Sequence, residues 1–485
     1  MQEGFAAFAR EVRTRGYQRV VLLGMGGSSL APEVFQSTFG AAPGRPALTV
    51  LDTTDPGSIA GLEVSLDLPR TLFIVSSKSG TTIETLSLYR YFSAKMRMAM
   101  GDSLDNFIAI TDPGTPLEKL ASQDGFWRCF LNPPDVGGRY SALSYFGLVP
   151  AAIIGVDIKL LLDSARRLDP RAGVGLGVAL AELADKGRDK VTFLPGGLTG
   201  FGAWAEQLIA ESTGKNGKGL VPVDGEPLGR PDAYADDRVF VRLRSADRPD
   251  GLDDHVRALE TAGQPVITID VPYAYDLGAE FLRLEIATAT AGALLGVNPF
   301  DEPNVREAKD ATSAILAQGS LDPDVSGETL TPYNGALVMV PLRGAEPGSY
   351  FAIQAFIQRT PEHNELLTRL RATVRFATRL ATTAGYGPRY LHSTGQLHKG
   401  GSNKAVFLQL TADDPEELPI PDSAYGFSTL KRAQALGDLR ALQSRGRRVM
   451  RVHLGADPTA GLARLLETMQ QSTAPAAPAA ATRGA

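Results

Sequence analysis

The chain has 485 residues, of which 43% are hydrophobic and 21% charged, which is typical of a globular protein with two or three domains. Its net charge of −5 and the lack of a basic run disfavour nucleic acid as a partner. Cys129 is the single cysteine, which excludes an intrachain disulfide framework and favours a cytoplasmic setting. The N-terminus lacks a signal-peptide pattern, and the most apolar window, residues 145–162, contains a proline and two charges, so we expect no membrane span.

Short apolar runs alternate with helical patterns through most of the chain, which favours an α/β fold of doubly wound parallel sheets. The spacing of apolar residues over 366–383 predicts an amphipathic helix. The runs that predict strands lie at residues 19–23, 48–51, 72–75, 107–110, 191–194, 239–243, 265–269, 351–356 and 405–410.

A weak internal repeat divides the chain. A strand, a Gly-rich loop and a helix start follow one another at residues 20–29 and again at 191–200, which indicates two related units, although the common plan of α/β proteins also produces such a likeness. Residues 319–334 are rich in Gly, Pro, Asp, Ser and Thr, as in a linker or long loop. We therefore expect a first domain over residues 1–165, a second over 166–330, a C-terminal α/β block over 331–470 and a disordered tail over 471–485.

The first Gly-rich loop, Gly24-Met25-Gly26-Gly27-Ser28-Ser29, suits close approach of the backbone to a phosphate. A dinucleotide fingerprint, G-x-G-x-x-G, would need glycine at position 29, and the acidic residue it requires further on has only Asp52 as a loose candidate. We therefore favour a sugar phosphate over a dinucleotide, with a plain strand-to-helix turn as the structural alternative.

Hydroxyl groups cluster at residues 76–82, directly after the apolar run at 72–75 and before a helix that is expected to begin at Ile83. A helix N-terminus leaves backbone N–H groups unpaired and carries a partial positive charge, so it binds anions. This segment predicts a phosphate site at the carboxyl end of a parallel sheet.

Three charged residues lie in segments that suit a catalytic site. Arg139 follows Gly137-Gly138, where it is able to hold a phosphate or stabilise an oxyanion, although alone it fits a surface loop equally well. Glu211 lies at the end of an apolar helical stretch, where the helix dipole raises its pKa, so a general base and a structural role remain equal alternatives. Lys309 lies about two turns into a predicted helix, a position typical of a solvated lysine unless the preceding loop lines a site.

Two of the five histidines, His392 and His398, occur in a segment rich in Gly, Ser and Thr. Histidine is the natural proton shuttle near neutral pH, so this segment indicates function. The spacing does not suit a zinc site, and we expect no metal.

In their order along the chain, these motifs resemble those of the glucose-6-phosphate isomerase family. The family's G-I-G-G-S loop, S-K-T-x-T-T-x-E-T phosphate loop, G-G-R-[YF]-S motif, Q-x-x-x-E-S-x-G-K motif and V-N-P-F-D-Q-P-G-V-E-x-x-K segment are similar to residues 24–28, 77–85, 138–141, 207–215 and 297–309. Chance is a poor explanation for five motifs in one order. The C-terminal block resembles the isomerase half of bifunctional transaldolase/glucose-6-phosphate isomerase proteins.

The resemblance implies two sugar-isomerase (SIS) domains that interconvert glucose 6-phosphate and fructose 6-phosphate through an enediolate, without a cofactor. It implies Glu211 as the base, Arg139 as the stabiliser of the enediolate, and Lys309 with a histidine for ring opening. A homodimer is implied, and a fusion or association with transaldolase is a further expectation. The residues expected to contact the sugar phosphate are Gly27, Ser28, Ser77, Lys78, Ser79, Thr81, Thr82 and Gln207.

Two departures from the family pattern matter. Glu302 stands where the family usually has Gln, and the family's G-x-x-x-Q-H context for the ring-opening histidine has no counterpart around residues 225–234. We therefore expect His398 of the C-terminal block to supply that histidine, with His392 as a nearly equal candidate. Two other functions remain open: isomerisation of a related sugar phosphate such as mannose 6-phosphate, and a non-catalytic sugar-phosphate sensor.

Overall fold

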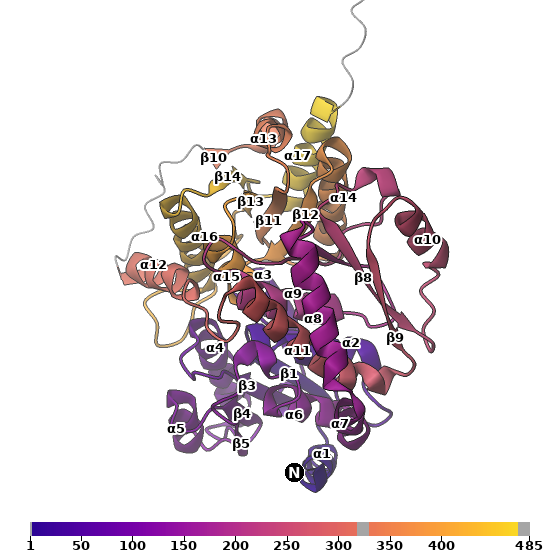
Figure 1. The fold of residues 1–485 in the computed structure, drawn as a ribbon. Coiled ribbons are helices and arrows are strands. Elements are labelled where there is room, and N and C mark those ends of the chain that lie inside the picture. The colour runs from indigo at the N-terminus through magenta and orange to yellow at the C-terminus, as the bar shows by residue number, and fades with distance from the viewer. Residues whose placement is uncertain (1, 318–328, 474–485) are drawn as a thin grey trace, which may run out of the picture.

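The computed structural model describes residues 2–317 and 329–473, which form three parallel sheets with helices packed around them (Figure 1). This arrangement confirms the predicted α/β class, with two doubly wound units and a C-terminal α/β block. None of the helices in the described ranges has the length and apolar character needed to cross a membrane.

The first sheet is covered by helices on both faces. Its strands pair in the order β2 (Ala47–Leu51), β1 (Arg19–Gly24), β3 (Thr71–Ser76), β4 (Phe107–Thr111) and β5 (Arg128–Leu131). Alternate residues of a strand point to opposite faces, so Leu22 and Ile74 pack with α1 (Gln2–Thr14), α2 (Leu30–Phe39) and α6 (Tyr145–Ile154). Leu23 and Val75 pack on the other face with α3 (Pro56–Val64), α4 (Ile83–Met100) and α5 (Pro116–Gln123).

The second sheet shares a hydrophobic core with the first, since Val191 and Val239 belong to the same buried cluster as Leu22. Close packing of α8 and α11 needs glycine, because a Cβ on Gly177 would lie 2.4 Å from the Ala287 carbonyl oxygen. The strands pair in the order β7 (Val221–Val223), β6 (Lys190–Phe193), β8 (Arg238–Ser245) and β9 (Val266–Val271), and the helices are α7 (Ile158–Arg167), α8 (Pro170–Asp185), α9 (Phe201–Thr213), α10 (Asp253–Thr261) and α11 (Leu277–Leu295).

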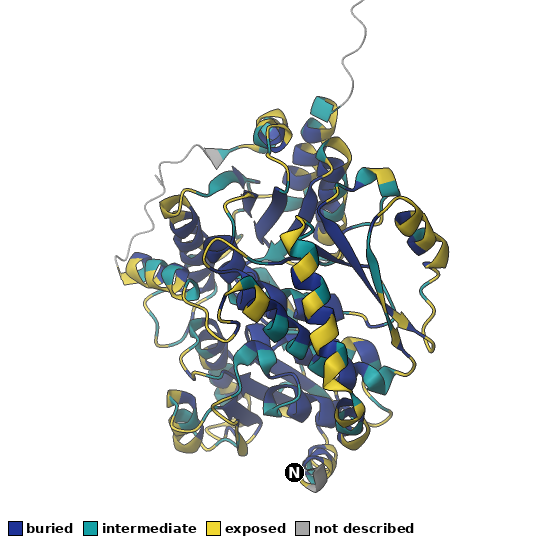
Figure 2. Ribbon diagram, viewed as in Figure 1, coloured by how far each residue is buried: buried dark blue, intermediate teal, exposed yellow. Residues whose placement is uncertain are grey.

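The third sheet has its own core, and its strands Tyr350–Phe356 and Ala405–Thr411 are buried along their whole length (Figure 2). Its strands pair in the order β10 (Thr329–Leu330), β14 (Arg448–His453), β13 (Ala405–Thr411), β11 (Tyr350–Phe356) and β12 (Ala381–Tyr386). The remaining α-helices are α12 (Val305–Ala317), α13 (Gly335–Arg343), α14 (Pro361–Thr378), α15 (Gly395–Gly400), α16 (Phe427–Ser444) and α17 (Pro458–Thr473).

Short 3-10 helices occur at several joints between these elements. Three of them belong to the site described below: η1 (Gly26–Ser28), η3 (Gly138–Tyr140) and η7 (Arg389–His392). The others are η2 (Leu68–Arg70), η4 (Pro231–Ala233), η5 (Ala274–Asp276) and η6 (Pro332–Asn334).

The predicted helix over 366–383 is wrong at its C-terminal end. Helix α14 ends at Thr378, Arg379 caps it with a positive φ of 63°, and residues 381–386 form strand β12. The tertiary context decides this change, because β12 pairs along its whole length with β11. Most of the expected linker, residues 318–328, and the tail residues 474–485 lie outside the described residues, and the domain boundaries stay a prediction.

Candidate active site

The hydroxyl-rich loop joins β3 to α4, as expected. The Oγ atom of Ser77 lies 2.9 Å from Thr82 Oγ1 and accepts a hydrogen bond from the Gly80 N–H at 3.1 Å. Gly80 has a φ of +66°, and a Cβ there would lie 2.8 Å from the Leu117 backbone nitrogen, so the turn requires glycine. Thr82 precedes the helix without capping it through its side chain, which leaves N–H groups of the first turn available to an anion.

A cavity of about 230 Å³ opens over this loop. Helix α12 supplies Lys309, η7 supplies His392, and α4 begins at its edge. The structure thus brings together, from segments far apart in the chain, five predicted site residues: Ser79, Thr81, Thr82, Lys309 and His392.

A buried carboxylate orients His392. Glu84 Oε1 lies 2.8 Å from His392 Nε2 and accepts a hydrogen bond from Gln434 Nε2 at 2.7 Å. Burial alone would raise the pKa of Glu84, but His392 and, more weakly, Lys309 hold that pKa below its usual value. Because an ionised carboxylate only accepts hydrogen bonds, the imidazole Nε2 donates, and within the described chain no hydrogen bond engages Nδ1.

Glu211 lies on α9 and is connected to His392 through one amide. Gln207 Nε2 donates to Glu211 Oε2 at 3.0 Å and to the His392 carbonyl oxygen at 2.8 Å. Burial raises the pKa of Glu211, Arg139 opposes that shift, and Glu302 adds to it. A carboxylate with a raised pKa beside a cation is suited to accept and return a proton near neutral pH.

Arg139 is fully buried rather than a surface arginine. Its Nε donates to Ser212 Oγ at 2.8 Å, and its Nη1 lies 2.8 Å from Glu302 Oε2 and 3.7 Å from Glu211 Oε1. Its Nη2 donates to the carbonyl oxygens of Pro299 and Asp301 at 2.7 and 2.9 Å. These contacts hold the guanidinium in a single position beside the Glu211 carboxylate.

The Gly-rich loop brings these parts together. A Cβ on Gly26 would lie 2.6 Å from the His392 carbonyl oxygen, and one on Gly27 would lie 2.0 Å from that of Gly138. Glycine at both positions therefore lets the segments that carry His392 and Arg139 pack against the first sheet. Gly27 and the buried Ser28 lie between these segments, and neither lines the cavity.

The structure does not bring Lys78 and His398 to this cavity. The ammonium group of Lys78 forms an ion pair with Asp112 and donates to the Pro134 carbonyl oxygen at 3.0 Å. His398 is buried in the C-terminal block, where its Nδ1 lies 3.2 Å from Gln354 Nε2 and burial lowers its pKa well below the usual value. The geometry therefore corrects the expectation that His398 is the histidine beside Lys309, a position held by His392.

Sequence reasoning assigned no role to Glu84 or Gln434. Glu84 had a local signal, since it directly follows the phosphate loop in the segment Thr82-Ile83-Glu84 and would be a buried acid at a helix start. Gln434 had no such signal in the sequence, because an amide side chain within a helix is ordinary. Its contact with Glu84 joins residues that are 350 positions apart.

Comparisons with known proteins agree with the motifs. A family model described as phosphoglucose isomerase matches residues 10–172. A glucose-6-phosphate isomerase of Rubrobacter xylanophilus is 31% identical over 370 residues, which cover 64% of this chain and 85% of that protein. A glucose-6-phosphate isomerase of Carboxydothermus hydrogenoformans is 30% identical over 377 residues, which cover 64% of this chain and 81% of that protein.

Solved structures agree on the fold. A hypothetical protein of Thermus thermophilus matches with a TM-score of 0.56 and 27% identity over 65% of this chain and 90% of its own. A glucose-6-phosphate isomerase of Chlamydia trachomatis matches with a TM-score of 0.56 and 20% identity over 67% of this chain and 74% of its own. The sequence relatives, which are at least 30% identical and matched over more than four fifths of their length, show that the chain belongs to the glucose-6-phosphate isomerase family.

Proposed function

We propose that the protein interconverts glucose 6-phosphate and fructose 6-phosphate by moving one proton between C2 and C1 of the open-chain sugar. The observation that carries this proposal is the single network of Glu211, Gln207 and His392, which ends at the cavity that holds the hydroxyl-rich loop. The names of the relatives support the same reaction.

The loop at the start of α4 anchors the phosphate. Ser79, Thr81 and Thr82 line the cavity at the N-terminus of the helix, an arrangement that favours a dianion. Anchoring the phosphate fixes the distance from the sugar's reacting carbons to the rest of the site. Ser77 stabilises this loop through its hydrogen bond with Thr82. Lys78 stabilises the loop through its ion pair with Asp112.

His392 opens the sugar ring, assisted by Lys309. Both residues line the phosphate cavity, whereas His398 does not. Glu84 fixes the imidazole through Nε2, so Nδ1 is the atom that exchanges a proton with the ring oxygen or the anomeric hydroxyl.

Glu211 then takes the proton from C2 and returns it to C1. The negative charge of the enediolate develops beside Arg139, which is already held in place by Ser212, so little reorganisation is needed when charge develops. A base and a cation that are both buried make this interaction stronger than it would be in water.

A coupled assay that converts fructose 6-phosphate, run beside a thermal-shift titration with the same sugar, tests the proposal. Turnover together with a shift supports an isomerase, and a shift without turnover would favour the sugar-phosphate sensor. Parallel runs with mannose 6-phosphate decide whether a related sugar is the better substrate.

The assembly belongs to the same proposal. We expect a homodimer, which light scattering on the purified chain tests directly. Association with a transaldolase and a cytoplasmic location stay predictions from the resemblance and from the single cysteine.

A further inference from the structure

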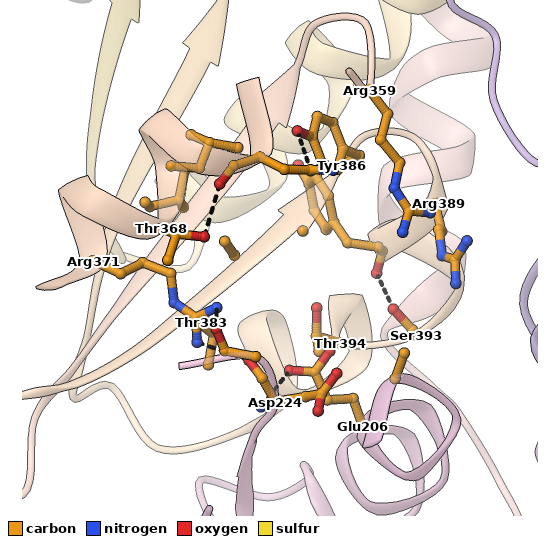
Figure 3. Close-up of a pocket in the computed structure, with 18 of the residues that line it drawn as sticks. Glu206, Asp224, Arg359, Thr368, Arg371, Thr383, Tyr386, Arg389, Ser393 and Thr394 are labelled. Atoms are coloured by element: carbon orange, nitrogen blue, oxygen red, sulfur yellow. Dashed lines mark hydrogen bonds between the residues drawn. The ribbon is translucent and has the colours of Figure 1, made fainter. Parts of the chain in front are cut away.

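Helix η7 separates the candidate active site from a second cavity. His392 at one end of η7 lines the first cavity, and Arg389 at the other end lines the second, whose volume is about 270 Å³. Its wall includes residues of helices α2, α9, α14 and α15 and of strands β11 and β12, and Asp224 at the end of β7. Figure 3 shows ten of the lining residues with labels. The volume of the cavity lies at the small end of the range for ligand sites, which suits a monosaccharide-sized molecule.

Several polar groups in the wall of this cavity lack side-chain partners. Thr383 and Thr394 are 6% and 7% exposed, and in residues 2–317 and 329–473 no hydrogen bond engages either hydroxyl. The carboxylates of Glu206 and Asp224 also lie in the wall, and no described side chain donates to them. Their oxygen atoms remain accessible from the cavity, where they are available to pair with the hydroxyl groups of a ligand.

The two carboxylates are neighbours. The Asp224 N–H donates to Glu206 Oε1 at 3.3 Å. Burial, and then the charge of Asp224, raises the pKa of Glu206 to about 8. The pair therefore presents acceptor oxygens to the cavity and, near neutral pH, one acidic proton. Sugar hydroxyl groups both donate and accept hydrogen bonds, so they pair well with these groups.

Arginines face the carboxylates across the cavity, with Arg359 and Arg389 together at the end opposite Glu206 and Asp224 (Figure 3). Both arginines pair with the carboxylate of Glu33, and Arg389 pairs with Asp52 as well. Arg359 is half exposed and uses only one of its guanidinium nitrogens in this contact, so it retains N–H donors for a further anion.

Arg371 lies along the side of the cavity (Figure 3). It donates to neutral oxygens, including the Gly225 and Thr382 carbonyls at 2.9 and 2.6 Å, and no carboxylate in the described chain lies within ion-pair distance of it. Its positive charge is therefore not neutralised by direct contact and favours an anion in the cavity.

We propose that this second cavity binds a small polyhydroxylated anion, a sugar acid or a sugar phosphate. The anionic group would lie against Arg359 and Arg389, and the hydroxyl groups would pair with Glu206, Asp224 and Thr383. This binding does not require the isomerase reaction, and none of these residues lines the phosphate cavity.

An occupant of this site would contact the segment that carries His392. Arg389 also lies 3.0 Å from Asp52, which accepts a hydrogen bond from Ser29 Oγ at 3.2 Å at the end of the Gly-rich loop. Ser393, the residue after His392, lines the second cavity. A ligand there is therefore positioned to change the rate of the reaction as well as to bind.

The test is isothermal titration of the full chain with gluconate, which has a carboxylate, and separately with sorbitol 6-phosphate, which has a phosphate. Each probe is titrated into the wild type, into Glu206→Gln/Thr383→Val and into the phosphate-loop variant Ser79→Ala/Thr82→Val. Both double variants keep side-chain shape, and their thermal unfolding is measured first. Thr394→Val is the substitute if the second-cavity variant does not fold.

We expect at least one probe to bind a site that the phosphate-loop variant keeps and whose affinity Glu206→Gln/Thr383→Val lowers by at least about tenfold, because the Thr383 hydroxyl is lost and one carboxyl oxygen of Glu206 becomes an NH₂ group. The probe that binds identifies the anionic group. If neither probe binds at millimolar concentration, or if all binding disappears in the phosphate-loop variant, the proposal is overturned.

Discussion

Replacing Glu211 with glutamine should separate activity from stability. General base catalysis contributes about 10²–10⁴-fold to a rate, so kcat should fall by this factor, which corresponds to about 2.7–5.4 kcal/mol in the activation barrier. The amide oxygen of the new side chain can still accept the hydrogen bond that Gln207 donates at 3.0 Å. Arg139 keeps Glu302 at 2.8 Å, so the site retains its shape.

The same substitution should leave the fold intact or stabilise it. Burial raises the pKa of Glu211, which means that the ionised form is disfavoured at this position. A neutral amide of the same size avoids that desolvation, so the free energy of unfolding at pH 7 should be unchanged within about 1 kcal/mol or higher. Urea unfolding measures it, and the coupled assay with fructose 6-phosphate measures kcat.

Glu302→Gln is the matched control, because it makes the same chemical change in the other carboxylate beside Arg139. Its kcat should fall less than about tenfold, since Glu302 is about half exposed and water weakens its ion pair with Arg139. The charge of Glu302 raises the pKa of Glu211, so the acid limb of the rate profile should move to lower pH. Near-normal turnover in Glu211→Gln, or an equal loss in both variants, would remove Glu211 from the role of base.

Three further outcomes follow from the geometry. His392→Ala should slow the reaction of the cyclic sugar and leave the stability of the fold normal. His398→Ala should lower the free energy of unfolding by a few kcal/mol and leave kcat normal in the folded fraction. Enzyme kinetics and urea unfolding on both variants measure these effects. Ser79→Ala/Thr82→Val should raise KM by roughly 10- to 100-fold for two lost phosphate contacts, and an unchanged KM would place the phosphate elsewhere. For Glu206, the pKa of about 8 in the folded chain lies above the ordinary value of 4.5, so the folded chain binds more protons between these two pH values. The stabilisation that this proton contributes is complete below pH 4.5 and is lost as the pH rises through about 8. Because glutamine has no such proton, Glu206→Gln should flatten the dependence of the melting temperature on pH over this range.

Local patterns predicted much of the fold. The apolar runs at 19–23 and 72–75 are strands β1 and β3. A strand with apolar side chains on both faces is stable in a sheet that helices cover on both sides. The loop before α4 was also predictable, since hydroxyl groups and a glycine at a helix start determine their own turn and hydrogen bonds. The helix over 366–383 was extended too far because its last residues take their conformation from pairing with β11, which is remote in the chain.

The choice between the two histidines could not be made from local patterns. His392 and His398 share one segment, and only packing places His392 against Glu84 of helix α4 and His398 against Gln354 of strand β11. The resemblance to the family left the same choice open, because the family's histidine context has no counterpart in the expected region.

The sequence by itself determined most of the strands, the hydroxyl-rich loop at a helix start, the order of the motifs and so the family. These features depend on residues close together in the chain, whose periodicity and backbone preferences act locally. The tertiary structure alone decided which side chains share a cavity: Glu84 with His392 and Gln434, and Arg389 with Glu206 in a second cavity. Such contacts join residues hundreds of positions apart, and their geometry is set by the packing of three sheets rather than by any neighbour in sequence.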